Sequence, residues 1–385
     1  MAVVRLEYAK GPKVGGKAAS LGEMLRLGVK VPPGFVVDST EYDKVADKPR
    51  DKDGLVKRLY VKALTQNIAA AYTEMGEGKV AVRSSAVGED GTALSFAGQH
   101  STFLNVEGLD EVIDAVLKCW ASLDNEQAIE YRKSNGIEKA SMAVVVQRMV
   151  DAEASGVMFT VNPTVIDGYH MVIEAVWGLG ETLVSGQLTP DQYLIHKKGQ
   201  ILETKTVLQE WELRDGASMS LIPDRQNAPK LTKEQILELA ELGLQLELEY
   251  GWPQDIEWCL QGGDLYIVQS RPITTLGANG TVAEVTGTVI AKGMSASKGV
   301  ASGVATKYSD CKVGDVLVTD ITNPSYLPTM KKAVAVVTGK GGMTCHAAIV
   351  CRELGIPCVV GVGNITGLFG KNVIVNGDAG VVTEA

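Results

Sequence analysis

The chain has 385 residues, of which 45% are hydrophobic and 22% are charged, as in soluble globular proteins of one to three domains. Its formal net charge is −9 and it has no run rich in Lys and Arg, which argues against a nucleic-acid partner. No stretch approaches the roughly 18 consecutive apolar residues of a membrane span, and the N-terminus lacks a signal-peptide pattern, so we expect no membrane segment.

Segments of helical and extended pattern alternate through the first 275 residues. Helical periodicity predicts helices at about 17–28, 54–75, 108–134 and 231–250, and apolar runs predict strands at 35–38, 79–83, 141–150, 169–176 and 191–197. Thr232 and Gln235 form a capping box at the start of the last helix. The strands IEWCLQ and DLYIVQS flank Gly262-Gly263, which is a β-hairpin signal. The pattern favours an α+β or α/β first domain.

The composition changes at 276–284, LGANGTVAE, where small and polar residues without periodicity indicate a linker. Beyond it, short Val- and Ile-rich strands separated by glycines predict a small second domain, mostly β with one main helix. We expect that helix to run from about Thr344 to Leu354, because Gly355 stops it and Pro357 follows.

His346 is a candidate functional residue because it falls in the first turn of that helix. The free backbone N–H groups and the positive end of the helix dipole favour negative charge there, and Gly341 and Gly342 let a ligand approach the backbone closely. A neutral imidazole is a competent nucleophile near pH 7, so a phosphoryl group on His346 would meet a ready anion site. A partly exposed capping histidine is the alternative, and position alone does not decide between the two.

The segment 341–361, GGMTCHAAIVCRELGIPCVVG, resembles the phosphohistidine signature of the phosphoenolpyruvate synthase and pyruvate phosphate dikinase family. The resemblance implies that His346 carries a phosphoryl group, with Thr344 beside it in the loop of Gly341 and Gly342. Met343 departs from the Arg or Lys often found at its position, which removes one phosphate contact.

Four further blocks, in the family's order, resemble its ATP-grasp domain. The first, VGGKAASLGEMLRLGVKVPPGF, has Lys17 at a helix start, where a lysine can reach nucleotide phosphates. Alone, GGK is better explained by a solvated lysine, and the block is not a P-loop. In the second block, 80–106, Arg83 ends a strand and can clamp phosphate, with pairing to Glu89 or Asp90 as the alternative. The resemblance implies nucleotide contacts from Lys17, Arg83, Gly98, Thr102 and Phe103.

The third block comprises VVVQRMVDAEASGVMFTVNP and VIEAVWGLGETLVSG. It resembles the strand whose edge meets adenine, followed by a loop at the nucleotide site. The resemblance implies adenine-edge contacts from Gln147, Met149 and Val150, and polar contacts from Glu174 and Glu181. Without the resemblance, the strand at 143–150 is better explained as plain core.

The fourth block, DIEWCLQGGDLYIVQSRPI, holds a candidate metal site. Glu257 and Gln269 lie on the two strands of the predicted hairpin and could face each other, and their carboxylate and amide oxygens suit Mg²⁺. Arg271 lies two residues beyond Gln269, on the same strand face, where it could stabilise a transferring phosphate. An ion pair of Arg271 with Glu257 is the alternative. The family motif implies metal binding by Glu257 and Gln269 and phosphate binding by Arg271.

The resemblance spans nearly the whole chain and implies its architecture. It implies an ATP-grasp domain over 1–275 with lobes at about 1–190 and 191–275, a hinge at 276–284, and a swivelling β/β/α phosphohistidine domain over 285–385. The six cysteines form no C-x-x-C pair, and buried reduced thiols in a cytoplasmic protein are the simplest interpretation.

In function, the resemblance implies a dikinase-type phosphotransferase that uses ATP and Mg²⁺, releases AMP, and passes phosphate from His346 to an acceptor such as pyruvate. Full-length family members continue with a barrel that binds pyruvate and phosphoenolpyruvate. No such segment follows NVIVNGDAGVVTEA, so we expect a separate subunit to supply the acceptor domain. A stand-alone phosphotransferase for another small molecule and a non-catalytic regulatory ATP-binding module are the alternatives. The intact set of candidate residues argues against the last.

Overall fold

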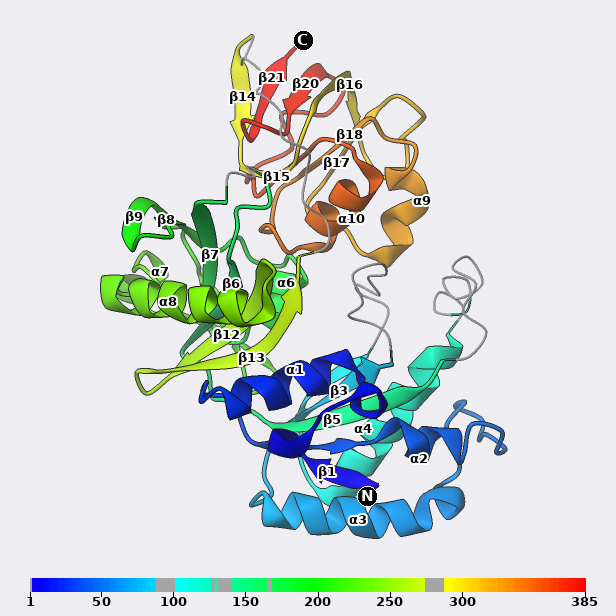
Figure 1. Cartoon of the computed structure of the whole chain (residues 1–385). Helices are drawn as coiled ribbons and strands as arrows, with labels where there is room; N and C mark the ends of the chain where they lie inside the picture. The colour runs from blue at the N-terminus through cyan, green and yellow to red at the C-terminus, as the bar shows by residue number, and fades with distance from the viewer. Residues whose placement is uncertain (1, 88–100, 126–128, 130–139, 165–167, 274–286) are drawn as a thin grey trace. The chain divides into compact units, whose positions relative to one another are not determined.

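The computed structural model describes residues 2–87, 101–125, 129, 140–164, 168–273 and 287–385 (Figure 1). Contacts divide the chain into two units, Met1–Asp151 with Gln261–Thr274, and Ala152–Leu260 with Thr275–Ala385. Strands on both sides of residue 190 pair in one sheet of the second unit, and the lobe boundary near residue 190 stays a prediction. The predicted hinge at 276–284 lies outside the described residues.

The first unit is built on an antiparallel sheet with the strand order β1-β2-β5-β3-β4. The strands of this sheet are β1 (Val3–Arg5), β2 (Gly34–Val37), β3 (Val80–Ala86), β4 (Thr102–Val106) and β5 (Met142–Arg148). The first unit also contains β13 (Asp264–Pro272), which comes from later in the chain and is not part of this sheet. Its α-helices are α1 (Gly15–Arg26), α2 (Ser39–Asp43), α3 (Lys62–Glu74) and α4 (Leu109–Ala121). Short 3-10 helices occur at Leu6–Tyr8, Pro12–Val14, Arg58–Val61 and Ser122–Asp124.

Strand β5 is apolar from Met142 to Val146 because both of its faces are covered (Figure 1). Val144 and Val146 belong to the core that α3 and α4 share, where Trp120 donates its Nε1–H to the Met142 carbonyl. Val145 is buried on the opposite face, where α1 packs. The continuous apolar run therefore reflects burial on both faces of the sheet rather than a helix.

The second unit contains an antiparallel sheet in which β12, β6, β7, β8 and β9 follow one another. Its strands are β6 (Ala154–Phe159), β7 (His170–Trp177), β8 (Asp191–His196), β9 (Gln200–Lys205) and β12 (Gln254–Gln261), with a hairpin of β10 (Trp211–Arg214) and β11 (Ala217–Ser220). The helices are α6 (Glu181–Val184), α7 (Pro223–Gln226) and α8 (Lys233–Tyr250). Helix α8 lies across this sheet, and its capping box of Thr232 and Gln235 is present, as the sequence predicted (Figure 1).

Residues 287–385 form an eight-stranded sheet with the order β14-β21-β20-β16-β17-β18-β19-β15. Its strands are β14 (Val289–Lys292), β15 (Met294–Ser297), β16 (Val300–Thr306), β17 (Val316–Thr319), β18 (Ala335–Thr338), β19 (Cys358–Val360), β20 (Asn372–Asn376) and β21 (Val381–Glu384). Strands β16 to β19 run parallel.

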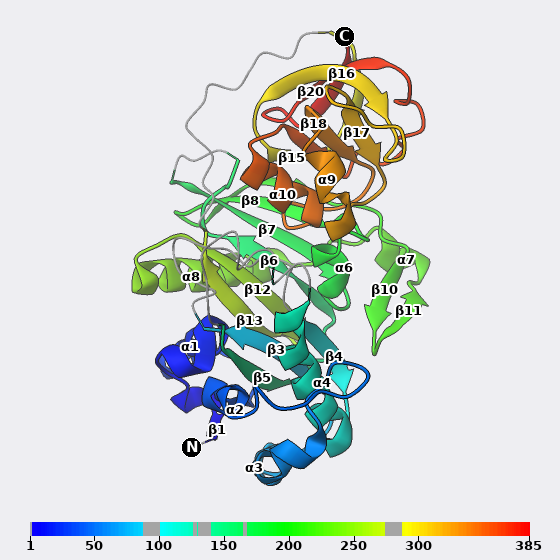
Figure 2. The same ribbon diagram turned by 90° about the vertical axis from the view of Figure 1, so that its right-hand side faces the viewer.

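One main helix, α10 (His346–Leu354), packs against β15, β18 and β19, and the shorter α9 (Leu327–Met330) follows a 3-10 turn at Pro324–Tyr326. Both helices lie beside the parallel strands in the two views (Figures 1 and 2). The predicted mostly-β domain with one main helix is therefore confirmed. Among the residues that the structure describes, no helix is both long and apolar enough to cross a bilayer.

Candidate functional site

His346 is the first residue of α10, which begins two residues later than the predicted Thr344, so His346 lies in the first turn as expected. Gly355 ends this helix in the left-handed conformation, with φ of 66°. Strands β17 and β18 are parallel, so the segments that follow them leave the sheet at the same edge. This arrangement brings Thr322, after β17, to the helix start, where its Oγ1 lies 2.9 Å from Nδ1 of His346.

The hydrogen bond to Thr322 orients the imidazole and selects its reactive nitrogen. When Nδ1–H donates to Thr322 Oγ1, the free lone pair of the neutral ring is on Nε2. His346 is half-buried, and this burial lowers the pKa of its imidazole below the ordinary value. The ring therefore stays neutral and nucleophilic at pH 7.

Backbone and hydroxyl donors beside His346 can hold an anion. The first N–H groups of α10 have no partner within the helix. Gly341 has φ of 108°, a conformation that favours glycine, and an added Cβ would lie 2.9 Å from Sγ of Cys345. The hydroxyl of Thr344 is buried and, within the described residues, has no hydrogen-bond partner. A phosphoryl oxygen is a suitable acceptor for that hydroxyl.

Glu174, which the resemblance assigned to the nucleotide site, has a partner in the loop before His346. Its two carboxylate oxygens accept from the Met343 N–H at 2.8 and 3.1 Å. The Met343 side chain is itself buried, and Nε2 of Gln192 lies 3.4 Å from its Sδ. This closed environment favours an apolar side chain at position 343, where the family often has Arg or Lys.

Lys17 lies in the first turn of α1, at a close approach to β3. Gly15 has φ of 74°, and an added Cβ would lie 2.2 Å from the Ser85 carbonyl oxygen, so glycine is required there. The Ser85 hydroxyl donates to the Val14 carbonyl and accepts from the Ala18 N–H. These bonds tie the start of α1 to the strand that carries Arg83, two residues before Ser85.

The guanidinium of Arg83 reaches from β3 to β13. Nη1 donates to the Val268 carbonyl and Nη2 to Oε1 of Gln269, both at 2.7 Å. Arg83 is also paired with Thr102 across β3 and β4, next to Phe103. The first unit therefore brings together predicted site residues that lie far apart in the sequence.

The strand predicted at the adenine edge is β5 and its continuation. Gln147 is buried, and its Nε2 donates to the Pro32 carbonyl at 3.2 Å, a structural hydrogen bond within the first unit. Met149 and Val150 follow the strand and are half-buried. Their adenine contacts stay a prediction. Gly98 and the alternative Arg83 partners Glu89 and Asp90 lie outside the described residues.

The donors proposed for Mg²⁺ fit that ion by their chemistry. Gln269 is buried, and the bond from Arg83 uses one lone pair of its Oε1, so the second can face a cation. Glu257 and Arg271 are half-buried on β12 and β13, and Glu181 is exposed at the start of α6. A carboxylate and an amide oxygen are ligands that Mg²⁺ accepts beside phosphate and water. In the part of the chain that the structure describes, no cluster of three or more His, Cys, Asp or Glu side chains forms a metal site.

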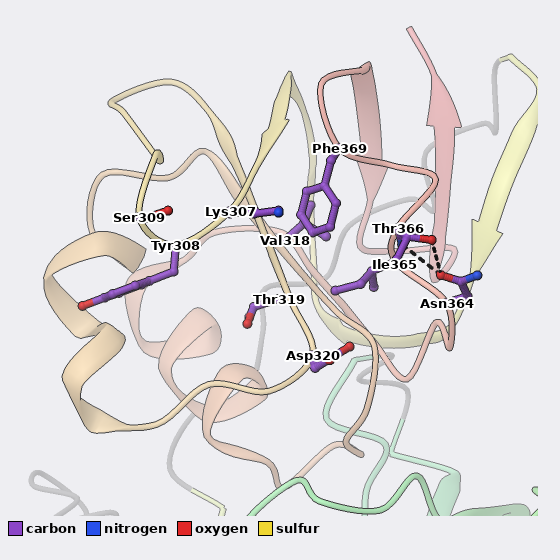
Figure 3. A pocket seen from close by; sticks show the side chains of 10 residues that line it. All are labelled: Lys307, Tyr308, Ser309, Val318, Thr319, Asp320, Asn364, Ile365, Thr366 and Phe369. Carbon is purple, nitrogen blue, oxygen red and sulfur yellow. Dashed lines mark hydrogen bonds between the residues drawn. The ribbon is translucent and has the colours of Figure 1, made fainter.

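A cavity of about 470 Å³ lies in the same domain as His346 but away from it (Figure 3). Lys307, Thr319, Asp320 and Phe369 are among its lining residues, and the Lys307 Nζ lies 5.3 Å from the centre of the Phe369 ring. Its apolar lining belongs to the core on the opposite side of the sheet from α10. None of the predicted site residues lines this cavity.

Sequence reasoning missed Thr322 and Ser85 as site residues. Thr322 lies 24 positions before His346, and only the parallel pairing of β17 and β18 brings the two together. A polar residue directly after a Val-rich strand is the signal that could have identified it, because ligands bind at the carboxyl ends of parallel strands. Ser85 carried no signal apart from its place in RSSA, after Arg83.

Two family models match this chain. The model described as "Pyruvate phosphate dikinase, AMP/ATP-binding domain" matches residues 11–62 and 52–288, and "PEP-utilising enzyme, mobile domain" matches residues 311–380. The first match includes Lys17, Arg83 and Gln269, and the second includes His346 and Thr322.

The curated relatives of this chain are longer than it is. It is 41% identical to the probable phosphoenolpyruvate synthase of Methanothermobacter thermautotrophicus, over 96% of this chain and 61% of that protein. It is 43% identical to the probable phosphoenolpyruvate synthase of Archaeoglobus fulgidus, over 97% of this chain and 56% of that protein. It is 40% identical to the phosphoenolpyruvate synthase of Pyrococcus furiosus, over 96% of this chain and 57% of that protein.

The chain therefore spans somewhat more than half the length of these relatives, and the matched part carries both the ATP-site blocks and the phosphohistidine loop. Its first match covers well over half of the sequence, and its mixed α+β architecture suits an ATP-grasp domain. The chain belongs to the pyruvate phosphate dikinase AMP/ATP-binding domain family, with an ATP-grasp fold followed by a PEP-utilising mobile domain.

Proposed function

We propose that this chain is the ATP-binding and phosphohistidine part of a dikinase-type phosphotransferase. The observation that carries the proposal is the neutral imidazole of His346 at the start of α10, held at Nδ1 by Thr322. Nε2 attacks the β-phosphorus of ATP, the bond from that phosphorus to the oxygen bridging the α- and β-phosphates breaks, and AMP leaves with that oxygen. The γ-phosphate then passes to water or phosphate, and phosphohistidine remains.

The cationic residues of the first unit offset the charge on the triphosphate. Lys17 and Arg83 lie on α1 and β3, which the Ser85 hydroxyl ties together, and Arg271 follows Gln269 on β13. Glu257 and Gln269 would hold Mg²⁺, which supplies further neutralisation when bound. Catalysis of this kind depends on positioning and on charge stabilisation rather than on a strong protein base.

The proposed acceptor is pyruvate or a similar small molecule, and its site lies outside residues 1–385. The support is that the relatives named phosphoenolpyruvate synthase contain a further part that this chain does not match. That further part is the proposed source of the acceptor site, and the second assay below tests whether a separate subunit can supply it. A cytoplasmic location is proposed because all six cysteines are free and five of them are buried.

Transfer of radioactive phosphate tests the proposal directly. The protein is incubated with Mg²⁺ and ATP labelled at the β-phosphate, and we expect acid-labile label on the protein together with AMP. His346→Ala should abolish the label, whereas His196→Ala, a matched control on β8, should keep it. Equal labelling of His346→Ala and the wild type, or ADP as the only nucleotide product, would contradict the proposal.

A second assay tests the acceptor. AMP release is measured with pyruvate alone and then with pyruvate and a candidate acceptor subunit. We expect multiple turnovers only when the subunit is present. Steady turnover with pyruvate alone would show that this chain binds the acceptor itself and would exclude the need for a separate subunit.

A further inference from the structure

Glu174 is a buried acidic residue that the mechanism above does not use. It lies in the middle of β7 with a side chain that is 0% exposed. Both of its carboxylate oxygens accept from the Met343 N–H, at 2.8 and 3.1 Å. Burying a carboxylate costs free energy unless its oxygens are hydrogen-bonded, so a carboxylate in this position calls for a specific role.

The loop of residues 341–345 packs closely on Glu174 and on Gly186, which follows α6. An added Cβ on Gly342 would lie 2.6 Å from Oε2 of Glu174 and 2.9 Å from its Oε1, so the carboxylate would have to shift. An added Cβ on Gly186 would lie 3.1 Å from the Cβ of Cys345, and Gly186 has φ of 75°, a conformation that favours glycine. The two glycines therefore allow the loop to lie close to Glu174.

Three charged or titratable groups lie near Glu174, one each on α10, on the 341–345 loop and on β12. Arg352 on α10 is half-buried, donates to the Met343 carbonyl, and lowers the pKa of Glu174, whereas Asp255 on β12 raises it. Cys345 is the third such group and keeps its proton, since burial raises the pKa of its thiol to about 12. Burial of Glu174 itself is the largest influence and raises the pKa of its carboxyl group to about 7.

We infer that Glu174 is a positioning residue that holds the 341–345 loop, and with it His346, against the sheet of β6 to β9. The inference rests on the proposed function of His346, because a carrier residue must be held still for phosphoryl transfer and then released. Glu174 touches neither ATP nor the transferred group in this role. It acts through the Met343 N–H, three residues before the nucleophile.

The strength of this contact depends on pH, with a defined sign. When the loop leaves, Glu174 becomes exposed and its pKa returns from about 7 toward the ordinary 4.5. The docked state therefore binds the proton more tightly, so docking is strongest below pH 4.5 and weakens as the pH rises to 7. Between pH 8 and pH 5, one such proton changes the docking equilibrium by up to about 100-fold. His346 titrates in the same range with the opposite sign, so a Glu174 variant is needed to isolate this effect.

Three substitutions separate the parts of the inference. Glu174→Gln keeps an amide oxygen for the Met343 N–H but cannot ionise. Glu174→Ala removes the acceptor, and Gly342→Ala leaves the carboxyl group but inserts a methyl into the contact. Glu212→Gln is the matched control, because Glu212 is also a buried acidic residue of this unit, paired with Arg225 away from the loop.

The experiment has three readouts on the full chain. Amide hydrogen exchange of the peptide containing Met343, corrected for intrinsic rates, reports docking without nucleotide. Single-turnover transfer of β-label reports positioning of His346, and the dissociation constant for ATP reports the nucleotide site. We expect fast exchange and at least roughly tenfold slower transfer in Glu174→Ala and Gly342→Ala, with ATP affinity unchanged. Glu174→Gln should keep slow exchange and lose the extra pH dependence, and Glu212→Gln should match the wild type.

Other results overturn the inference. The inference is wrong if the Met343 peptide exchanges as slowly in both Glu174→Ala and Gly342→Ala as in the wild type. It is also wrong if the exchange of this peptide depends on pH in the same way in Glu174→Gln and in the wild type. Weaker ATP binding with unchanged exchange would make Glu174 a nucleotide contact instead. If the wild type takes up no label at all, the proposed function fails, and the exchange data alone still decide whether Glu174 holds the loop.

Discussion

At the scale of single residues, the hydrogen bond between Thr322 Oγ1 and His346 Nδ1 orients the imidazole. Thr322→Val removes the acceptor for Nδ1–H and leaves the ring free to turn and to change tautomer. A lost hydrogen bond of about 1–1.5 kcal/mol corresponds to roughly tenfold slower transfer of β-label to His346. Thr322→Ser keeps the hydroxyl and should retain nearly the wild-type rate. Equal single-turnover rates for the valine variant and the wild type would rule out this role for Thr322.

The burial of His346 also predicts the pH dependence of its phosphorylation. Only the neutral ring attacks, and burial lowers the pKa of His346 below 6.5, so the neutral form persists to lower pH than in an exposed histidine. In Glu174→Gln, which lacks the opposing titration of Glu174, the rate of label transfer should therefore rise with pH and reach half of its maximum below pH 6.5. A midpoint above pH 6.5 in single-turnover measurements on folded protein would contradict this expectation.

Lys230 is a residue whose importance is structural. Its Nζ lies 2.8 Å from Oδ1 of Asp191, and both side chains are 0% exposed. Lys230→Met leaves the Asp191 carboxylate buried without its cation, and we expect a loss of roughly 3–5 kcal/mol in the free energy of unfolding by urea. The exposed pair of Lys30 and Asp264 provides the control, since Lys30→Met should cost about 1 kcal/mol or less. Similar costs for the two variants would show that burial of the pair does not matter.

At the scale of elements, glycines inside strands mark places where another backbone lies very close. Gly156 in β6 is such a place, because an added Cβ would lie 1.8 Å from the Glu174 carbonyl oxygen and 2.7 Å from the Trp258 ring. Gly156→Ala should lower the free energy of unfolding by roughly 3 kcal/mol or more, because neither the backbone nor the packed ring can move away. Gly199→Ala, at a turn with open space and φ of 81°, should cost only about 1 kcal/mol. Urea denaturation of the two variants provides the comparison.

Elements with strong local signals could be predicted from the sequence. The helix at 231–250 has its capping box, and α10 begins at His346 and ends before a left-handed Gly355, because these features depend on neighbouring residues alone. The two-sided burial of β5 and the close approach at Gly156 depend on which elements pack against them. No local pattern specifies that.

At the scale of the whole molecule, Arg83 joins β3 to a strand that lies 185 residues later in the chain. The two terminal nitrogens of its guanidinium donate hydrogen bonds to the Val268 carbonyl and to Oε1 of Gln269, and a lysine cannot reproduce both bonds. Arg83→Lys should therefore raise the dissociation constant for ATP with Mg²⁺ by about tenfold, by the loss of one charge-assisted hydrogen bond. Arg58→Lys, which alters an exposed fork to Asp110 and Asp114, should leave it unchanged. Titration calorimetry measures both, and unchanged affinity in Arg83→Lys would contradict the predicted phosphate contact.

The division of the chain shows what sequence order hides. The first unit combines Met1–Asp151 with Gln261–Thr274, which includes β13, and β7 pairs with β8 in the second unit. Antiparallel pairing between distant strands is set by the packing of both partners, and composition alone did not reveal it.

The sequence by itself determined the family and the helix that begins at His346, because these rest on contiguous motifs and on local helix-terminus rules. Only the tertiary structure decided that Thr322 orients His346, that Arg83 holds Gln269, and that Glu174 binds the Met343 N–H. Each of those contacts joins residues brought together by sheet pairing and packing across the chain. Glu174 illustrates the difference: its motif predicts a nucleotide contact, which stays a prediction, whereas its burial and its bond to the Met343 N–H became visible only in the tertiary structure.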